Sequence, residues 1–176
     1  MMSSSNILRI AGIVEESIVD GPGIRFVIFT QGCPHHCPGC HNPSTWSFEG
    51  GTPMEEKQIL QIIQTNPLCR GVTFSGGEPF AQPEGFCKLA ILLKAHGYEV
   101  ASYSGYTFEQ LLHGTAAQQQ LLQHIDVLID GPFLMAERSL NLSFRGSKNQ
   151  RILDVPASLK AGHAVCITKG RWVGEY

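Results

Sequence analysis

The sequence lacks any hydrophobic run long enough to cross a membrane. Its longest apolar stretches, such as 26–29 and the run that contains 90–93, are at most five residues long, whereas a membrane-spanning helix needs about 20. The N-terminal residues MMSSSN contain neither a basic segment nor an apolar one, so no secretion signal is predicted. We therefore expect a cytoplasmic protein that does not bind a membrane.

A strong excess of charge of one sign is also missing. The chain has 13 basic and 15 acidic residues and a formal net charge of -2, so direct binding of nucleic acid through charge is not expected. Hydrophobic residues make up 43% of the chain, which is enough for a core and argues against disorder and against a disulfide-stapled miniprotein. With 176 residues, the whole chain, 1–176, is predicted to form one domain.

Glycines and prolines separate segments whose hydrophobicity is periodic. Strands are predicted at 7–14, 24–29, 72–75, 98–103, 126–130, 151–155 and 164–168. Helices are predicted after a capping box at 52–55, around 86–93, and from a second capping box at 107–110 to about 124.

This alternation of strands and helices predicts a parallel sheet with right-handed crossovers. A closed eight-stranded barrel needs roughly 200 residues or more. Two α/β architectures therefore remain, an open, partial (β/α) barrel and a doubly wound sheet. In both of them, the loops that follow the strands hold the site.

Three of the six cysteines lie within eight residues, with the spacing C-x3-C-x2-C: Cys33, Cys37 and Cys40. In a cytoplasmic chain, such a cluster indicates metal or redox chemistry before disulfides. Three thiolates can hold three corners of an iron–sulfur cube and leave one iron free to bind a small molecule. The alternative is a zinc site completed by a histidine such as His41, although zinc ligands usually come as two separated pairs. The spacing favours the iron–sulfur cluster.

Five segments together resemble one enzyme family. They are 20–25 (DGPGIR), the cysteine triplet at 33–40, 40–43 (CHNP), 75–79 (SGGEP) and 144–151 (FRGSKNQR). In this order they resemble the radical S-adenosylmethionine enzymes. Among these enzymes, the set is most similar to the glycyl-radical-enzyme activases that act on anaerobic ribonucleoside-triphosphate reductase.

The resemblance implies an α/β fold, an open partial (β/α) barrel with a parallel sheet of the radical S-adenosylmethionine type. Residues of about 24–130 would bind the cluster and the cofactor, and 131–176 would form a C-terminal segment. The implied enzyme is an oxidoreductase that cleaves S-adenosylmethionine with a [4Fe-4S] cluster. It would generate a glycyl radical on a glycine loop of the reductase, with electrons from a flavodoxin- or ferredoxin-type donor.

The resemblance also implies roles for individual residues. Cys33, Cys37 and Cys40 would ligate the cluster, and no further catalytic residue is expected. The implied contacts to S-adenosylmethionine come from Gly39, His41, Gly76, Gly77, Glu78, Ser104 and Asp130. The implied contacts to the partner enzyme come from Arg145, Gly146 and Asn149, although this loop is alternatively a cofactor-carboxylate site or a solvated loop. Taken singly, the residues at strand ends are equally typical of ordinary turns.

Other functions remain open at this point. They are an activase of the pyruvate formate-lyase type, a radical enzyme that acts on a small molecule, a zinc-stabilised binding module and a ferredoxin-like electron carrier. The turn at 76–78 favours an enzyme, because a carrier has no use for it. Arg25 lies in an apolar strand and needs a partner if it is buried, which the cluster region or Glu78 is predicted to supply. Cys87 is predicted to be a small buried hydrophobe.

Overall fold

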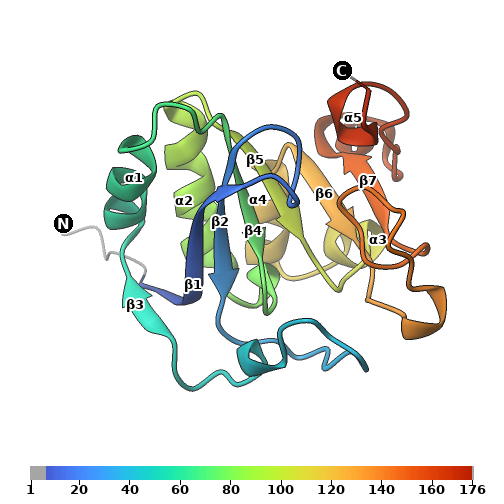
Figure 1. Cartoon of the computed structure of the whole chain (residues 1–176), viewed down its shortest axis with the longest axis horizontal. Helices are drawn as coiled ribbons and strands as arrows, with labels where there is room; N and C mark the ends of the chain where they lie inside the picture. The colour runs from blue at the N-terminus through green and yellow to red at the C-terminus, as the bar shows by residue number, and fades with distance from the viewer. Residues whose placement is uncertain (1–6, 176) are drawn as a thin grey trace.

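The computed structural model describes residues 7–175. Within them, a seven-stranded sheet has the order β3-β1-β2-β4-β5-β6-β7 (Figure 1). The strands are β1 (Leu8–Ser17), β2 (Arg25–Thr30), β3 (Thr52–Met54), β4 (Gly71–Ser75), β5 (Glu99–Tyr103), β6 (Val127–Asp130) and β7 (Arg151–Asp154). The four central strands, β2, β4, β5 and β6, are parallel, while β1, β3 and β7 join through antiparallel pairings.

The helices cover one face of this sheet. They are α1 (Glu56–Gln64), α2 (Pro83–Ala95), α3 (Phe108–Leu112), α4 (Ala116–Gln123) and α5 (Val155–Ala161), with 3-10 turns η1 (Pro43–Thr45), η2 (Pro79–Ala81), η3 (Met135–Glu137) and η4 (Arg171–Val173). Side chains of α1 to α4 enter a single core with the central strands. A doubly wound sheet has helices on both faces. The predicted open partial (β/α) barrel is therefore confirmed.

Alternate side chains of the strands enter two separate cores. Phe26, Phe74 and Leu128 face the helices in the larger core. On the opposite face, Ile129 belongs to a smaller core that Trp172 of η4 completes. Because both faces are buried, the parallel strands are nearly continuous runs of apolar residues, as predicted for 24–29.

The start of the first helix differs from the prediction. Residues Thr52–Met54 form β3 instead of a capping box, because they pair antiparallel with the edge of β1. Helix α1 begins after Glu55, and its capping box is formed by Glu55 and Gln58. The helix predicted from 107 to about 124 is also wrong in part. It is divided into α3 and α4, and α4 has a capping box of its own.

The region after β6 was the least predictable from periodicity. Strand β7 confirms the prediction for 151–155, but 164–168 contributes only an isolated bridge between Leu153 and Cys166. Helix α5 was not predicted. The side chain of Asp154 caps it by accepting a hydrogen bond from the Ala157 N–H at 2.9 Å, a local signal that a short helix leaves in the sequence.

Among the described residues, no helix combines the length and the hydrophobicity that crossing a membrane requires. The N-terminal segment 1–6, from which the lack of a secretion signal is predicted, lies outside the described residues. The division into 24–130 and 131–176 stays a prediction.

Two substitutions in α2 test the packing of the helix-facing core. Leu93 is fully buried, whereas Ile91 is 47% exposed on the same helix. Leu93→Ala should lower the free energy of unfolding by about 2–5 kcal/mol. Ile91→Ala should change it by no more than about 0.5 kcal/mol. Urea unfolding followed by circular dichroism measures both, and equal losses would contradict the described orientation of α2.

Candidate functional site

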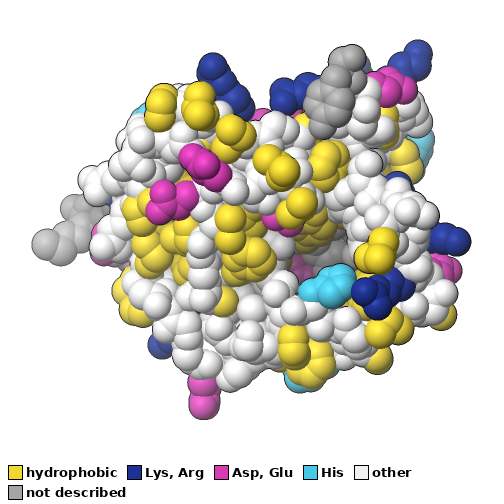
Figure 2. Space-filling model, viewed as in Figure 1, with side chains coloured by type: hydrophobic (Ala, Val, Ile, Leu, Met, Phe, Trp, Pro, Cys, Tyr) yellow, Lys and Arg dark blue, Asp and Glu magenta, His cyan; other side chains and the backbone are white. Residues whose placement is uncertain are grey.

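The carboxyl ends of the parallel strands open into one cavity of about 560 Å³. Phe29, Ser75 and Tyr103 line it from the ends of β2, β4 and β5. In Figure 1 the β2 arrow points towards the edge where the segment after β2 lies, and Figure 2 shows the viewed face hollowed right of centre. A cavity of this size is typical of a small-molecule site.

All three clustered cysteines line this cavity. Cys33 is buried, Cys37 and Cys40 are partly exposed, and all are free thiols. In the part of the chain that the structure describes, no three His, Cys, Asp or Glu side chains converge closely enough to hold one metal ion. The thiols instead border a shared space. The other cysteines lie away from it, two of them buried and one exposed: Cys69, Cys87 and Cys166.

Backbone N–H groups face the sulfur atoms of the cysteine loop. The Asn42 N–H donates to Cys40 Sγ at 3.4 Å. Burial raises the pKa of the Cys33 thiol, while the backbone N–H groups of His35 and His36 act on that pKa in the opposite direction. Hydrogen bonds of this kind stabilise the thiolate, which is the form that ligates a metal.

The predicted cofactor contacts divide into two groups. Four of them line the cavity: His41, Gly76, Gly77 and Ser104. The remaining three lie outside its lining: Gly39, Glu78 and Asp130. Gly39 has a left-handed φ of +77°, and the side chain of Met135 leaves no room for a Cβ at this position.

The two glycines after β4 make a close turn against the start of the cysteine loop. Gly76 and Gly77 have φ values of +46° and +55°, and a Cβ at Gly77 would overlap the backbone oxygens of Thr30 and Gly32. The Gly76 C=O accepts from the Thr30 N–H at 3.1 Å, and the Gly77 N–H donates to Thr45 Oγ1 at 2.8 Å. Glycine is therefore required here by packing as well as by access to the cavity.

The carboxylate of Glu78 is fully buried and is bound by the protein itself. Its Oε1 accepts from the His35 Nε2 at 2.6 Å, the Gly105 N–H at 2.8 Å and the Ser104 hydroxyl at 2.9 Å. Its Oε2 accepts from the Phe80 N–H at 3.1 Å. Both oxygens are engaged within the protein, so Glu78 fixes the turn, and its predicted contact to S-adenosylmethionine stays a prediction. Sequence reasoning missed His35, since nothing in the sequence distinguishes it from its neighbour.

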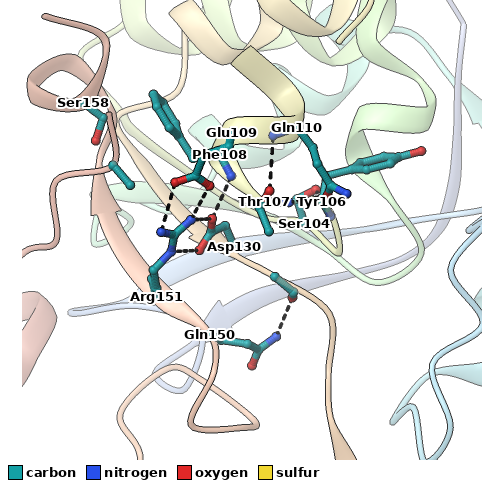
Figure 3. Close-up of polar contacts among 12 residues, drawn as sticks. Ser104, Tyr106, Thr107, Phe108, Glu109, Gln110, Asp130, Gln150, Arg151 and Ser158 are labelled. Carbon is teal, nitrogen blue, oxygen red and sulfur yellow. Dashed lines mark hydrogen bonds and ion pairs between the residues drawn. The ribbon is translucent and has the colours of Figure 1, made fainter. Parts of the chain in front are cut away.

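Asp130 is also bound within the protein (Figure 3). Its carboxylate accepts from the Phe108 N–H at 2.7 Å and from Arg151 Nε at 3.0 Å. Arg151 also pairs with Glu109 at 2.8 Å, and this hydrogen bond lowers the pKa of Glu109. Asp130 therefore joins the ends of β6 and β7 to the start of α3. The structure gives it a structural role and does not bring it to the cavity.

The loop at 145–151 folds against the mouth of the cavity. Arg145 and Gly146 line the cavity, and Arg145 Nη1 donates to the Gln150 C=O at 3.3 Å. The Arg145 Nε is buried and has no hydrogen-bond partner among the described residues. Asn149 differs, because its side-chain amide donates to the Pro132 C=O at 2.7 Å. Two of the three predicted partner residues thus reach the cavity.

Arg25 is buried, but the prediction of its partner is wrong. Its guanidinium pairs with Glu99 at 2.8 Å and donates to Thr73 Oγ1 at 2.9 Å. The ring of Trp172 lies 5.1 Å from it, within the range of a cation–π contact. These groups satisfy the cation on the face of the sheet opposite the helices, which we call the inner face. Arg25 therefore does not need Glu78 or the cysteine loop as a partner.

Comparison with known proteins identifies the family. The family model "4Fe-4S single cluster domain" matches residues 19–153. The anaerobic ribonucleoside-triphosphate reductase-activating protein of Salmonella typhimurium is 38% identical over 141 residues, which cover 76% of this chain and 90% of that protein. Its counterpart in Escherichia coli strain K12 is 37% identical over 142 residues, with the same coverage.

Two further proteins are similar over shorter stretches. The pyruvate formate-lyase-activating enzyme of Clostridium pasteurianum is 37% identical over 127 residues, which cover 67% of this chain and 53% of that enzyme. The crystal structure of QueE from Escherichia coli aligns with a TM-score of 0.49 and 19% identity, over 57% of this chain and 54% of QueE.

The matched model and the cysteine loop define an iron–sulfur protein of the single-cluster class. Within this class, the chain belongs to the family of anaerobic ribonucleoside-triphosphate reductase-activating proteins. The resemblance drawn from the five sequence segments is confirmed. The three cysteines fit the 4Fe-4S cluster that the family model names, because their free thiols border one space and leave room for a further ligand.

The structural role of Asp130 can be tested without any cofactor. Asp130→Asn should lower the free energy of unfolding by about 1–3 kcal/mol, because it weakens the hydrogen bonds that the buried carboxylate accepts from the Phe108 N–H and Arg151. Glu109→Gln removes the exposed partner of Arg151 and should cost only about 0.5 kcal/mol. Denaturant unfolding of the cluster-free protein measures both. Full stability of the Asp130 variant would contradict this structural role.

The Glu109 variant also has a predicted pH dependence. The folded-state pKa of Glu109 is lowered. Its contribution to the free energy of unfolding is therefore fully present above the unfolded-state pKa, and it is lost as the pH falls through the folded-state pKa. The difference in stability between the wild type and Glu109→Gln should thus be constant near neutral pH and shrink below about pH 4.

Proposed function

We propose that this protein is a radical S-adenosylmethionine activase that generates a glycyl radical on anaerobic ribonucleoside-triphosphate reductase. The observation that carries the proposal is the position of the three cysteines. They have the spacing of the radical S-adenosylmethionine enzymes and line a single cavity at the carboxyl edge of a partial barrel. The named activities of relatives that are 37–38% identical over most of the chain support it.

The residues of this chain would hold the cluster and S-adenosylmethionine, orient them and enclose them in the cavity. Cys33, Cys37 and Cys40 would ligate three irons of a [4Fe-4S] cluster, which when bound supplies the electron that cleaves S-adenosylmethionine. The turn at Gly76 and Gly77 presents backbone without side chains to the same cavity.

The proposed substrate is a glycine loop of the reductase. The sheet is open on its inner side, and the loop carrying Arg145 and Gly146 borders the cavity there. Val19, which is 69% exposed, also borders the cavity. A protein segment could therefore reach the cavity from this open side. The flavodoxin- or ferredoxin-type donor, the cytoplasmic location and the lack of nucleic-acid binding stay predictions.

A pyruvate formate-lyase type of activase is the second candidate. Its support is the 37% identity to the Clostridium pasteurianum enzyme. This chain covers only 53% of that enzyme, however, and 90% of the reductase-activating relatives. The fuller match favours the reductase as the partner.

The cluster ligands can be tested by single substitutions. After anaerobic reconstitution with iron and sulfide, Cys37→Ala should abolish cleavage of S-adenosylmethionine, because one iron loses its thiolate. Its circular dichroism should be unchanged, since neither core includes Cys37. Cys87→Ala, at a buried position of α2, should retain the cluster and its activity. Tightly bound zinc without a brown chromophore in the wild type would contradict the proposal.

The role of the 145–151 loop can be separated from that of the cluster. Arg145→Ala should leave cluster content and uncoupled cleavage of S-adenosylmethionine intact. Formation of the glycyl radical should fall by about a hundredfold, because misplacing reacting groups by about 1 Å has effects of that order. The two quantities are 5′-deoxyadenosine and the glycyl radical signal in electron paramagnetic resonance. Equal loss of both would assign Arg145 to the cofactor instead, and loss of neither would indicate a solvated loop.

A further inference from the structure

We propose that His35 is a positioning residue that fastens the cysteine loop to the barrel through the buried carboxylate of Glu78. This inference rests on the proposed function, because it concerns the loop that would hold the cluster. His35 lies two residues from Cys33 and two from Cys37. A group that fixes His35 therefore fixes the backbone that carries both thiols.

Apart from His35, the groups that bind the Glu78 carboxylate lie outside the cysteine loop, whereas the Glu78 N–H itself donates to the Gly32 C=O at the beginning of the loop, at 2.8 Å. The N–H of Phe80 and the hydroxyl and N–H of two residues after β5, Ser104 and Gly105, all donate to its carboxylate. A fully buried carboxylate is costly unless such donors satisfy it. The ends of β4 and β5 thus present a fixed acceptor, to which the His35 Nε2 donates at 2.6 Å.

The imidazole of His35 is confined on further sides. Its ring makes an edge contact with the Tyr106 ring, with centroids 4.5 Å apart and planes at 74°. It also lies directly against Gly105, where a Cβ would overlap the ring. Only 18% of the side chain is exposed. A glycine at position 105 therefore leaves the space that the imidazole occupies.

Among the described residues, the His35–Glu78 bond is the side-chain hydrogen bond that joins segment 34–39 to the ends of the strands. Backbone bonds hold the beginning of the loop, from the Gly32 N–H to the Thr45 C=O at 2.7 Å and from the Cys33 N–H to the Trp46 C=O at 3.1 Å. Further along, the Cys40 N–H bonds within the loop itself. The His35–Glu78 bond is therefore placed to set the position of the middle of the loop. Glu78 acts on the site through His35, since both of its oxygens are engaged.

Two substitutions break this contact in different ways. His35→Ala removes the donor, whereas Gly105→Ala leaves both partners in place and displaces the ring. His35→Gln is the conservative variant, because its side-chain amide can donate from near the position of Nε2. His36→Asn is the matched control in the same loop. Its ring stacks on Trp46 instead of bonding Glu78, and asparagine tolerates its positive φ.

The first measurement uses the cluster-free protein. Hydrogen exchange of the hydrogen-bonded amides of Cys33 and Cys40 should become about tenfold faster in His35→Ala and Gly105→Ala, as expected for loss of a buried bond to a charged group. Exchange in His35→Gln and His36→Asn should stay close to that of the wild type. Unchanged exchange in both disrupting variants, or equal acceleration in His36→Asn, would overturn the proposal.

The second measurement uses the reconstituted protein. Iron release to a chelator should be about tenfold faster in His35→Ala and Gly105→Ala, and the electron paramagnetic resonance signal of the reduced cluster should shift. His35→Gln should restore both properties, and its failure to do so would overturn the role of the hydrogen bond. If the wild type assembles no cluster, the proposed function fails, while the exchange experiment still decides whether His35 fastens the loop.

Discussion

A parallel sheet must have both of its faces covered, and this constraint organises the molecule. Four helices, α1 to α4, cover one face of the central strands. Among the described residues, a small core around Trp172 covers part of the other face and includes Ala101 of β5 and Val127 of β6. The strand ends beyond it stay uncovered, and the cavity lies there. The site is thus the part of the inner face that the chain leaves open.

Buried charges complete this inner face and its rim. Arg25 pairs with Glu99, Asp130 pairs with Arg151, and Glu78 accepts hydrogen bonds from three neighbouring segments. Each charge joins elements that are distant in the sequence. Removing one partner of such a pair leaves the other charge unpaired in a poorly solvated position. Polar residues near the cavity therefore shape it without having to touch what it binds.

The sequence predicted the parallel sheet and the place of the cysteine loop after a strand, because hydrophobic periodicity and the spacing of the thiols are local patterns. It left the partial barrel and the doubly wound sheet open, and only the family resemblance implied the partial barrel. It did not predict the partners of the buried charges. Asp130 stands at the end of a strand, where ligand-binding residues are expected, yet its carboxylate pairs with Arg151 from the neighbouring strand β7. Helix α5 was not predicted because its seven residues are too few to show a clear helical periodicity. His35 was missed because only the fold brings Glu78 to it.

The contact between Arg25 and Trp172 has a consequence for synthesis of the protein. Arg25 belongs to β2, whereas Trp172 lies beyond β7. A chain made from its N-terminus therefore exposes the guanidinium of Arg25 long before the indole that covers it has left the ribosome. Contacts between such distant segments form late, because a long loop must close first. The helix-facing core can assemble during translation, but the inner face must wait until translation has passed Trp172.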